Sequence, residues 1–170
     1  TEMRQAGLTA TELGPEGFLP TNTVDLVELL DSHGLSCVGG FVPVVLFKDD
    51  HDPAEDLAGP LESLVAAGAG VVVLAAATGL DGYDARPILD EQQWATLLSN
   101  LDRLADIVAA RGLTAVLHPH VGTMVEEESV GPGPAAQQVC TRAARQDVVA
   151  RHAVDGVILG GARHPVGRIG

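Results

Sequence analysis

The hydrophobic residues as far as residue 118 follow one repeated unit: a helical pattern, a glycine, one apolar residue and a short apolar run. Glycine suits the end of each helical pattern because it readily takes the left-handed conformation that terminates helices. The four apolar runs, which we predict to be strands, are residues 8–13, 36–42, 71–76 and 113–118. Strands that alternate with helices predict a parallel sheet, with all four C-terminal strand ends on one side.

Three helices are predicted between these strands, each with a polar residue that can cap its first turn. The caps are Asn22 or Thr23 for residues 24–32, Asp52 for a helix that begins at Pro53, and Asp90 for residues 91–110. Pro60 lacks a backbone N–H, so we expect the second helix to form two short pieces or to kink. In the third helix, apolar residues at spacings of three and four predict one buried face.

Composition indicates one globular unit. At 170 residues and 46% hydrophobic content, the chain can bury one sizeable core. No apolar run approaches the ~20 residues that cross a bilayer, so we predict no membrane partner. The two cysteines, Cys37 and Cys140, give neither a disulfide framework nor a metal motif, and we expect buried thiols. With no recognisable signal peptide, these features predict a cytoplasmic location.

Charge divides the chain into two parts. Residues 1–128 carry a net charge of −16 and residues 129–170 carry +3, and the break follows three glutamates and a glycine–proline turn. The acidic part argues against nucleic acid as a partner, because nucleic-acid binding requires a basic face. We predict one domain over residues 1–128. Residues 129–170 then form a divergent C-terminal tail, either one more helix–strand unit or a disordered segment.

Polar residues crowd the end of the last predicted strand. His118 and His120 are two residues apart, so both should point to one side, at the strand end where parallel α/β proteins bind ligands. Imidazole ligates divalent metals and acts as a general base near neutral pH, so the two histidines are candidate site residues. The alternative interpretation is that they are ordinary polar residues of a loop. Glu126 is a candidate metal ligand, although an acid at a helix start is also explained by the helix dipole.

A second polar group follows the first predicted strand. Glu12 lies at the end of that strand, among apolar residues, where a carboxylate requires a partner or a polar site. The alternative interpretation is that Glu12 is a solvated residue of a turn. Gly14 lets the backbone approach a ligand closely. Thr123, near the histidines, either binds substrate or caps a helix. We therefore predict Glu12, Gly14 and Thr123 as substrate-binding residues.

Two stretches, ATELGPEGFLP at residues 10–20 and LHPHVGTMVE at residues 117–126, resemble the xylose isomerase-like TIM-barrel family of sugar isomerases and epimerases. Within that family the resemblance is to inosose dehydratase-like proteins, and it extends over about residues 1–128. It implies a (β/α)8 barrel with a divalent metal, manganese or cobalt, at its mouth. It also implies a small sugar or polyol as the partner.

The resemblance assigns chemistry to the predicted site. It implies His118 and His120 as catalytic residues, and the same two histidines together with Glu126 as metal ligands. Which histidine touches the metal stays open. The implied reaction is proton abstraction next to the carbonyl of a keto-inositol or a ketose, the first step that isomerases and dehydratases share.

The chain departs from the family pattern at both ends. It has no strand before the helix that ends at Gly7, and the later strands with their metal ligands are not recognisable. We therefore expect an α/β fold that is a partial (β/α)8 TIM barrel, with the first strand and the last strands missing. The alternative function is a non-catalytic, truncated or frame-shifted fragment, whose open strand edges favour self-association.

Overall fold

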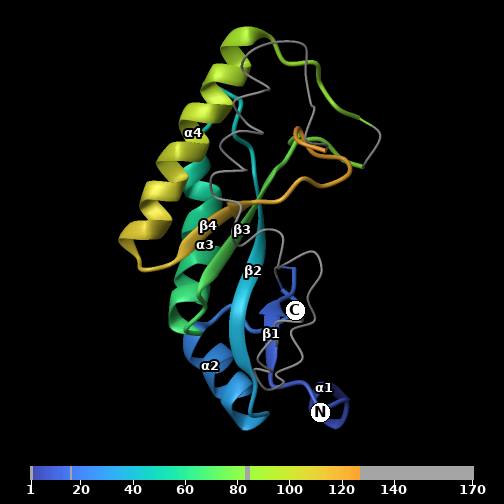
Figure 1. Cartoon of the computed structure of the whole chain (residues 1–170), viewed down its shortest axis with the longest axis vertical. Helices are drawn as coiled ribbons and strands as arrows, with labels where there is room; N and C mark the ends of the chain where they lie inside the picture. Colours follow the sequence, from blue (N-terminus) through green and yellow to red (C-terminus); the bar gives the residue numbers. More distant parts are fainter. Residues whose placement is uncertain (1, 16, 83–84, 127–170) are drawn as a thin grey trace, which may run out of the picture.

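The computed structural model describes residues 2–15, 17–82 and 85–126 (Figure 1). The elements within these residues are α1 (Glu2–Gln5), β1 (Ala10–Leu13), α2 (Thr23–Ser32), β2 (Ser36–Val44), α3 (Pro53–Ala66), β3 (Val71–Ala76), α4 (Glu91–Ala110) and β4 (Thr114–Leu117). The predicted tail over residues 129–170, with its helix–strand alternative, lies outside the described residues.

The four strands form one parallel sheet in the order β1-β2-β3-β4. This confirms the predicted strands and places their C-terminal ends on one side of the sheet. The two first strands differ in length: Leu13, the last residue of β1, pairs with Gly40, whereas β2 continues to Val44. The last residues of β2 therefore have no β1 partner, which leaves a gap at this corner of the sheet.

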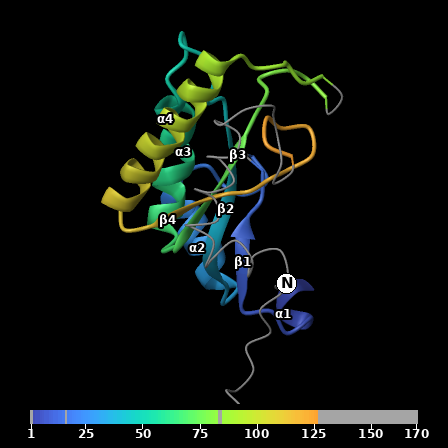
Figure 2. The ribbon, with the colours of Figure 1, turned by 45° about the horizontal axis from the view of Figure 1, so that its top comes forward.

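Helices α2, α3 and α4 lie together on one face of the sheet (Figures 1 and 2). The core between the two layers consists of leucine and valine side chains, among them Leu26, Leu57, Leu64, Leu97, Val44, Leu74 and Leu117. Among the helices of the described residues, none is long and apolar enough to cross a membrane.

The opposite face of the sheet carries the alternate side chains of each strand. Glu12, Phe41, Val73 and Val116 belong to this series, because their neighbours Leu13, Val42, Leu74 and Leu117 pack into the core beneath the helices. His118 continues the same series one position beyond β4. The alternation therefore directs the side chains of two candidate site residues, Glu12 and His118, away from the helices.

Side-chain caps begin three helices as predicted. Asn22, and not Thr23, caps α2, and Asp52 caps α3. Asp90 caps α4 in a capping box, in which the Asp90 and Gln93 side chains each accept from the other residue's backbone N–H. These local bonds satisfy N–H groups that have no partner inside the helix.

Helix α3 runs unbroken across Pro60, so the predicted division into two pieces is wrong. A proline in a helix interior removes one hydrogen bond and costs about 3 kcal/mol. Leu57, Leu61 and Leu64 of the same helix are all buried against the sheet. Burial of each leucine stabilises by ~1.5–3 kcal/mol, so packing outweighs the local cost of the proline.

Cys37 is buried in β2, as predicted for a structural thiol. Its burial raises the pKa of the thiol, because the charged thiolate is disfavoured away from water. Cys37 is therefore an unreactive part of the core, whereas Cys140 lies outside the described residues.

Replacing Gly39 with alanine should destabilise the fold. A Cβ at this position would lie 2.8 Å from the backbone carbonyl oxygen of Val71, and the backbone of β3 cannot yield without loss of strand pairing. We expect a loss of about 1–3 kcal/mol in the free energy of unfolding. Urea unfolding measures it.

Gly70→Ala is the matched control. Apart from its chain neighbours, a Cβ at Gly70 meets nothing within 4 Å, and the residue has no positive φ. Alanine there should change the free energy of unfolding by no more than about 0.5 kcal/mol, because an open site accepts a methyl group without strain. Equal effects of the two substitutions would contradict the close packing of β2 on β3.

Candidate functional site

Two histidines extend the line of β4. The His118 backbone N–H donates to the Leu74 carbonyl oxygen at 2.8 Å, which prolongs the pairing with β3. The His120 backbone N–H donates to the Val125 carbonyl oxygen at 3.0 Å, which closes the following loop. Both side chains are half-buried, and their ring centroids lie 5.8 Å apart. The structure therefore brings the two predicted catalytic imidazoles together at the carboxyl end of the sheet.

Phe41 forms a cluster of three rings with these histidines. Its ring centroid lies 6.0 Å from that of His118, nearly perpendicular at 80°, and 5.5 Å from that of His120. Such tilted and edge-to-face arrangements are the favourable geometries of aromatic pairs. The imidazoles therefore rest against an apolar wall that β2 supplies.

Partial burial lowers the pKa of the His118 imidazole. Loss of hydration of the charged form is the largest cause; the neighbouring His120 adds to it, and Glu12 opposes it. Glu12 is itself exposed, but its effect shows that this carboxylate of β1 lies within electrostatic reach of His118. His118 is therefore held in its neutral form near pH 7.

A backbone carbonyl fixes the proton on His120. Its Nδ1 lies 2.8 Å from the carbonyl oxygen of Val121. A carbonyl oxygen can only accept, so Nδ1 carries the hydrogen and the neutral ring keeps its lone pair on Nε2. In the neutral tautomer that this hydrogen bond favours, the lone pair of the His120 ring is therefore on Nε2.

The loop after His120 is folded around the hydroxyl of Thr123, a residue that is only 7% exposed. This oxygen lies 2.7 Å from the His120 carbonyl oxygen and 2.8 Å from that of Val125. The Met124 N–H donates to the Ala76 carbonyl oxygen at 2.7 Å and fastens the loop to the end of β3. Thr123 therefore holds the loop that carries His120, and the substrate contact expected of it stays a prediction.

Glu126 is engaged by two neighbours. Its Oε1 accepts from the Gly122 N–H at 2.7 Å, and its Oε2 lies 3.1 Å from Nη1 of Arg86. Arg86 belongs to the connection between β3 and α4, so the ion pair joins two loops. Partly exposed pairs of this kind contribute up to about 1 kcal/mol.

No group of three or more His, Cys, Asp or Glu side chains within the described residues is arranged to hold a metal ion. His118 and His120 approach each other, whereas the carboxylate of Glu126 is occupied by Arg86 and Gly122. The predicted ligand set of His118, His120 and Glu126 is not assembled in this part of the chain, and their metal roles stay predictions.

A cavity of about 570 Å³ lies at the corner where β1 ends. Its walls come from the β1–α2 connection, the last residues of β2 and one side of α3, and they are mostly apolar. Among the residues that line it, Gly14 is a predicted site residue, whereas Glu12, Thr123 and the two histidines are not in its wall. Phe41 belongs to both the cavity and the cluster of three rings.

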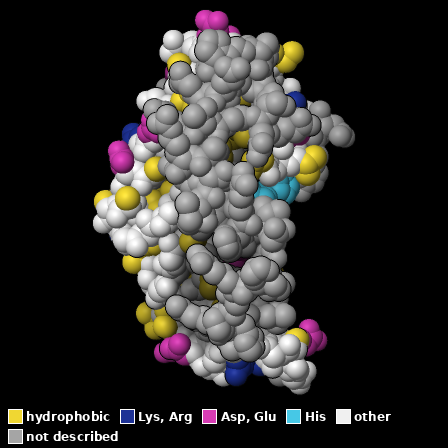
Figure 3. All heavy atoms as spheres, viewed as in Figure 1, with side chains coloured by type: hydrophobic (Ala, Val, Ile, Leu, Met, Phe, Trp, Pro, Cys, Tyr) yellow, Lys and Arg dark blue, Asp and Glu magenta, His cyan; other side chains and the backbone are white. Residues whose placement is uncertain are grey.

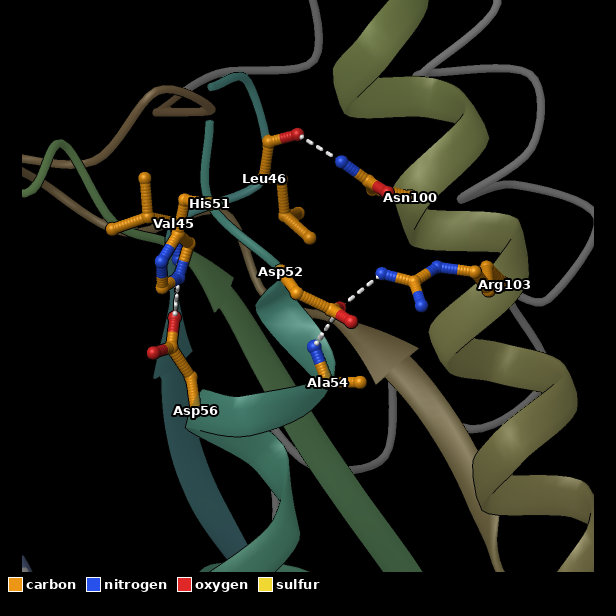
Figure 4. A network of polar contacts seen from close by, with 8 residues as sticks. All are labelled: Val45, Leu46, His51, Asp52, Ala54, Asp56, Asn100 and Arg103. Atoms are coloured by element: carbon orange, nitrogen blue, oxygen red, sulfur yellow. Dashed lines mark hydrogen bonds and ion pairs between the residues drawn. The ribbon is translucent and has the colours of Figure 1, made fainter. Parts of the chain in front are cut away.

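A second polar cluster lies at the carboxyl end of β2 (Figure 4). Oδ2 of Asp56, in α3, accepts from the Val45 N–H at 3.1 Å and lies 2.8 Å from Nε2 of His51. Asp56 also lines the cavity. This carboxylate therefore fixes the β2–α3 connection on the helix that follows it.

Helix α4 binds the same connection. Nδ2 of Asn100 donates to the Leu46 carbonyl oxygen at 2.9 Å, and Arg103 pairs with Asp52 (Figure 4). The contact with Arg103 lowers the pKa of the Asp52 carboxyl group. The cluster serves to hold α3 and α4 together above the end of the sheet.

Sequence patterns alone do not identify three of these residues as parts of the candidate site or its surroundings. Phe41 is interpretable from sequence as core or pocket wall, but its contact with the imidazoles depends on the pairing of β2, β3 and β4. Arg86 stands in a stretch with no helical or strand pattern, so nothing in its spacing points to Glu126. His51 follows the carboxyl end of a predicted strand, and the rule that selects His118 would also select it.

Comparison with known proteins gives partial relatives. No protein-family model matches the chain. The chain is 29% identical over 134 residues to the inosose dehydratase of Geobacillus thermodenitrificans. This alignment covers 74% of this chain and 44% of that protein. It is also 31% identical over 135 residues to the rhizopine catabolism protein MocC of Rhizobium meliloti. That alignment covers 75% of this chain and 41% of the relative. The chain therefore spans less than half the length of these curated relatives.

Solved structures show the fold. An AP endonuclease of family 2 from Brucella melitensis matches with a TM-score of 0.55 and 18% identity, over 69% of this chain and 47% of that one. The IOLI protein with a bound zinc atom matches with a TM-score of 0.54 and 18% identity, over 84% of this chain and 52% of that one. These comparisons confirm the resemblance to inosose dehydratase-like proteins and the partial TIM-barrel architecture. Because one of these structures is an endonuclease, the fold alone does not select a reaction.

Thr123→Val should loosen the loop that carries His120. The substitution removes the hydroxyl that bridges the carbonyl oxygens of His120 and Val125, and a buried unpaired polar group costs about 1–3 kcal/mol. Thr123→Ser keeps the hydroxyl and should cost less. Urea unfolding and the NMR shifts of the His120 ring protons test both variants. Native stability and unshifted ring protons in the valine variant would show that the hydroxyl does not hold this loop.

Proposed function

We propose that this chain forms the part of a sugar- or polyol-converting enzyme that abstracts a proton next to a carbonyl group. The observation that carries the proposal is the pair of half-buried imidazoles, His118 and His120, beside Phe41 at the carboxyl end of the sheet. Similarity to inosose dehydratases and to a catabolic protein supports a small substrate, a keto-inositol or a ketose.

The two imidazoles suit different roles. His120 has its proton on Nδ1, so its Nε2 lone pair accepts the proton from the carbon next to the carbonyl. The electrons of that C–H bond form a C–C double bond, and the carbonyl electrons move onto oxygen to give an enediolate. His118, a neutral imidazole with one N–H, donates a hydrogen bond to that oxygen.

The first step leads to either of two products. Delivery of the proton to the former carbonyl carbon, with transfer of the hydroxyl proton to the enediolate oxygen, moves the carbonyl group by one carbon and completes an isomerisation. Loss of the hydroxyl group from the next carbon, protonated as it leaves, completes a dehydration and releases water. Both routes need the same base and the same oxyanion donor, so the imidazole pair supports an isomerase or a dehydratase.

A divalent metal, expected to be manganese or cobalt, belongs to the proposal only for the whole enzyme. The zinc atom of the IOLI protein, which shares the fold, supports it. The residues described in this chain do not by themselves fit a complete metal site, because they contain no group of three suitable side chains. No step of the reaction is therefore assigned to a metal.

The expected partner is a small polar molecule and not a nucleic acid. On the face drawn in Figure 3, the basic side chains of the described surface are scattered and form no patch, and acidic side chains lie at both ends. A net charge of −13 repels phosphate backbones. A cytoplasmic location and self-association also remain predictions.

The alternative is a non-catalytic fragment of such an enzyme. The observation that favours this alternative is that, among the described residues, no third side chain joins His118 and His120 to form a metal site. The two functions differ in one measurable step, because only the catalytic chain exchanges the proton next to the carbonyl of a keto-inositol with solvent.

Replacing His118 or His120 with alanine should reduce that exchange by about 10²–10⁴-fold, the usual contribution of a general acid or base. Deuterium incorporation into a keto-inositol in D₂O measures the rate, and urea unfolding checks that each variant is folded. His33→Ala is the matched control, because His33 ends α2 at the opposite end of the sheet. Unchanged exchange in both site variants would refute the roles of these histidines.

Manganese or cobalt should not raise the thermal unfolding midpoint of the 170-residue chain. A ligand that binds the native state stabilises it by an amount that grows with the logarithm of its concentration relative to its Kd, and the described residues offer two imidazoles without a third ligand. Thermal melts with and without each metal provide the measurement. A midpoint that rises with metal, and no longer rises in the His118→Ala variant, would show that a metal site is complete.

A further inference from the structure

The cavity at the end of β1 is a space that the proposed function does not use. Its volume of about 570 Å³ lies within the range of small-molecule sites. Leu26 and Leu64 in its wall are buried, whereas Gly17 and Thr21 are exposed to solvent, so the cavity is open on one side. Neither imidazole of the candidate site lines it. A ligand can therefore enter this cavity without passing the histidines.

One face of α3 forms a side of the cavity. The residues that α3 contributes follow one another at spacings of three and four, which places them on a single helix face: Asp56, Gly59, Pro60, Ser63 and Leu64. Gly59 has no side chain and Ser63 has a short one, so this face fills little of the space in front of it. The small residues of α3 therefore help to keep the cavity open.

Asp56 is the only charged side chain among the described residues that line the cavity. Its contacts with the Val45 N–H, at 3.1 Å, and with Nε2 of His51, at 2.8 Å, both use Oδ2. Within the described residues, Oδ1 has no hydrogen-bond or ion-pair partner. An ionised carboxylate can only accept hydrogen bonds, so Asp56 keeps acceptor capacity at an otherwise apolar wall.

The charge of Asp56 is also incompletely balanced. His51 compensates it only when the imidazole is protonated, and no lysine or arginine of the described residues pairs with it. A backbone oxygen of the same residue adds to this character. Pro60 has no N–H, so the Asp56 carbonyl oxygen lacks the hydrogen bond that the residue four positions later normally donates. A ligand that suits this wall must supply hydrogen-bond donors and positive charge.

We propose that this cavity is a second binding site, which takes a small organic cation: an amine whose apolar body lies against the leucines and whose ammonium group donates to Asp56. Burial of the apolar body removes it from water, which is favourable. The hydrogen bond between an ammonium group and a carboxylate is charge-assisted and stronger than one between neutral groups. The proposal does not rest on the function proposed for the imidazole pair.

Three probes with the same apolar body test the charge preference of the 170-residue chain: phenethylamine, phenethyl alcohol and phenylacetate. Backbone amide shifts of Gly59 and Ser63 in NMR titrations give each Kd and show that the probe binds at α3. We expect a Kd for the amine at least about tenfold lower than for the alcohol, and weakest binding for phenylacetate. Salt at about 0.15 M screens the long-range field of the acidic chain.

Two variants separate a charge effect of Asp56 from a structural one. Asp56→Asn should abolish the preference for the amine over the alcohol, because it removes one local charge while the chain stays strongly acidic. His51→Ala is the matched control, since it also removes a contact that holds the β2–α3 connection but leaves the carboxylate of Asp56 in place. This variant should keep the preference for the amine. Urea unfolding checks that both variants are folded.

Ser63→Leu tests the cavity itself without touching the charge. Leucine is a better helix former than serine, and its side chain occupies part of the space in front of α3. We expect it to weaken the amine and the alcohol alike, by at least about tenfold, because a filled cavity admits the same body only with strain. Ser32→Leu is the matched control. Ser32 is also a helical serine whose hydroxyl donates to a backbone carbonyl oxygen, but it does not line the cavity.

Four results would each overturn the proposal. The first is equal affinity of the wild-type chain for the amine and the alcohol, or no binding of either. The second is a preference for the amine that survives in Asp56→Asn, which would assign it to the net charge. The third is loss of that preference in His51→Ala, which would make the role of Asp56 structural. The fourth is unchanged binding in Ser63→Leu, which would place the probes outside the cavity.

Discussion

The close packing of β2 between β3 and α3 is the constraint on which the rest of the structure depends. Two consecutive glycines make it possible, since a Cβ at Gly39 would lie 2.8 Å from the Val71 carbonyl oxygen and one at Gly40 would lie 3.0 Å from Leu64. The register of β2 against β3 is thereby fixed. Phe41 follows directly and pairs with Val73, which in turn pairs with Val116 of β4. The geometry of the ring cluster therefore depends on a backbone contact at Gly39, two residues before Phe41.

Unequal strand lengths then shape the carboxyl end of the sheet. Because β1 stops opposite Gly40 while β2 continues to Val44, the chain after β1 leaves the sheet and bounds a cavity over α3. Beyond β2, Asp56 holds the next connection through Val45 and His51. One end of the molecule therefore has a firmly held loop beside an open apolar space, and the candidate site lies next to both.

Local sequence signals predict the elements of this fold but not the contacts between them. The caps at Asn22, Asp52 and Asp90 and the repeated helix–glycine–strand unit act within a few residues, so the sequence shows them directly. The continuity of α3 across Pro60 depends instead on leucines buried by the sheet. The pairing of Glu126 with Arg86 and the contact of Phe41 with the imidazoles join segments that only the folded sheet brings together. The spacing of two residues predicts that His118 and His120 meet, but it contains no information on their protonation.

The difference between the two imidazoles arises from their surroundings in the fold. Burial and the neighbouring imidazole lower the pKa of His118, so its neutral state prevails near pH 7. For His120, the Val121 carbonyl oxygen decides which ring nitrogen keeps its proton. Val121 belongs to the loop that the buried Thr123 hydroxyl and the Met124–Ala76 bond hold in place. Because this loop holds the Val121 carbonyl beside His120, the buried Thr123 hydroxyl supports that hydrogen bond through the backbone, without any need to contact a substrate.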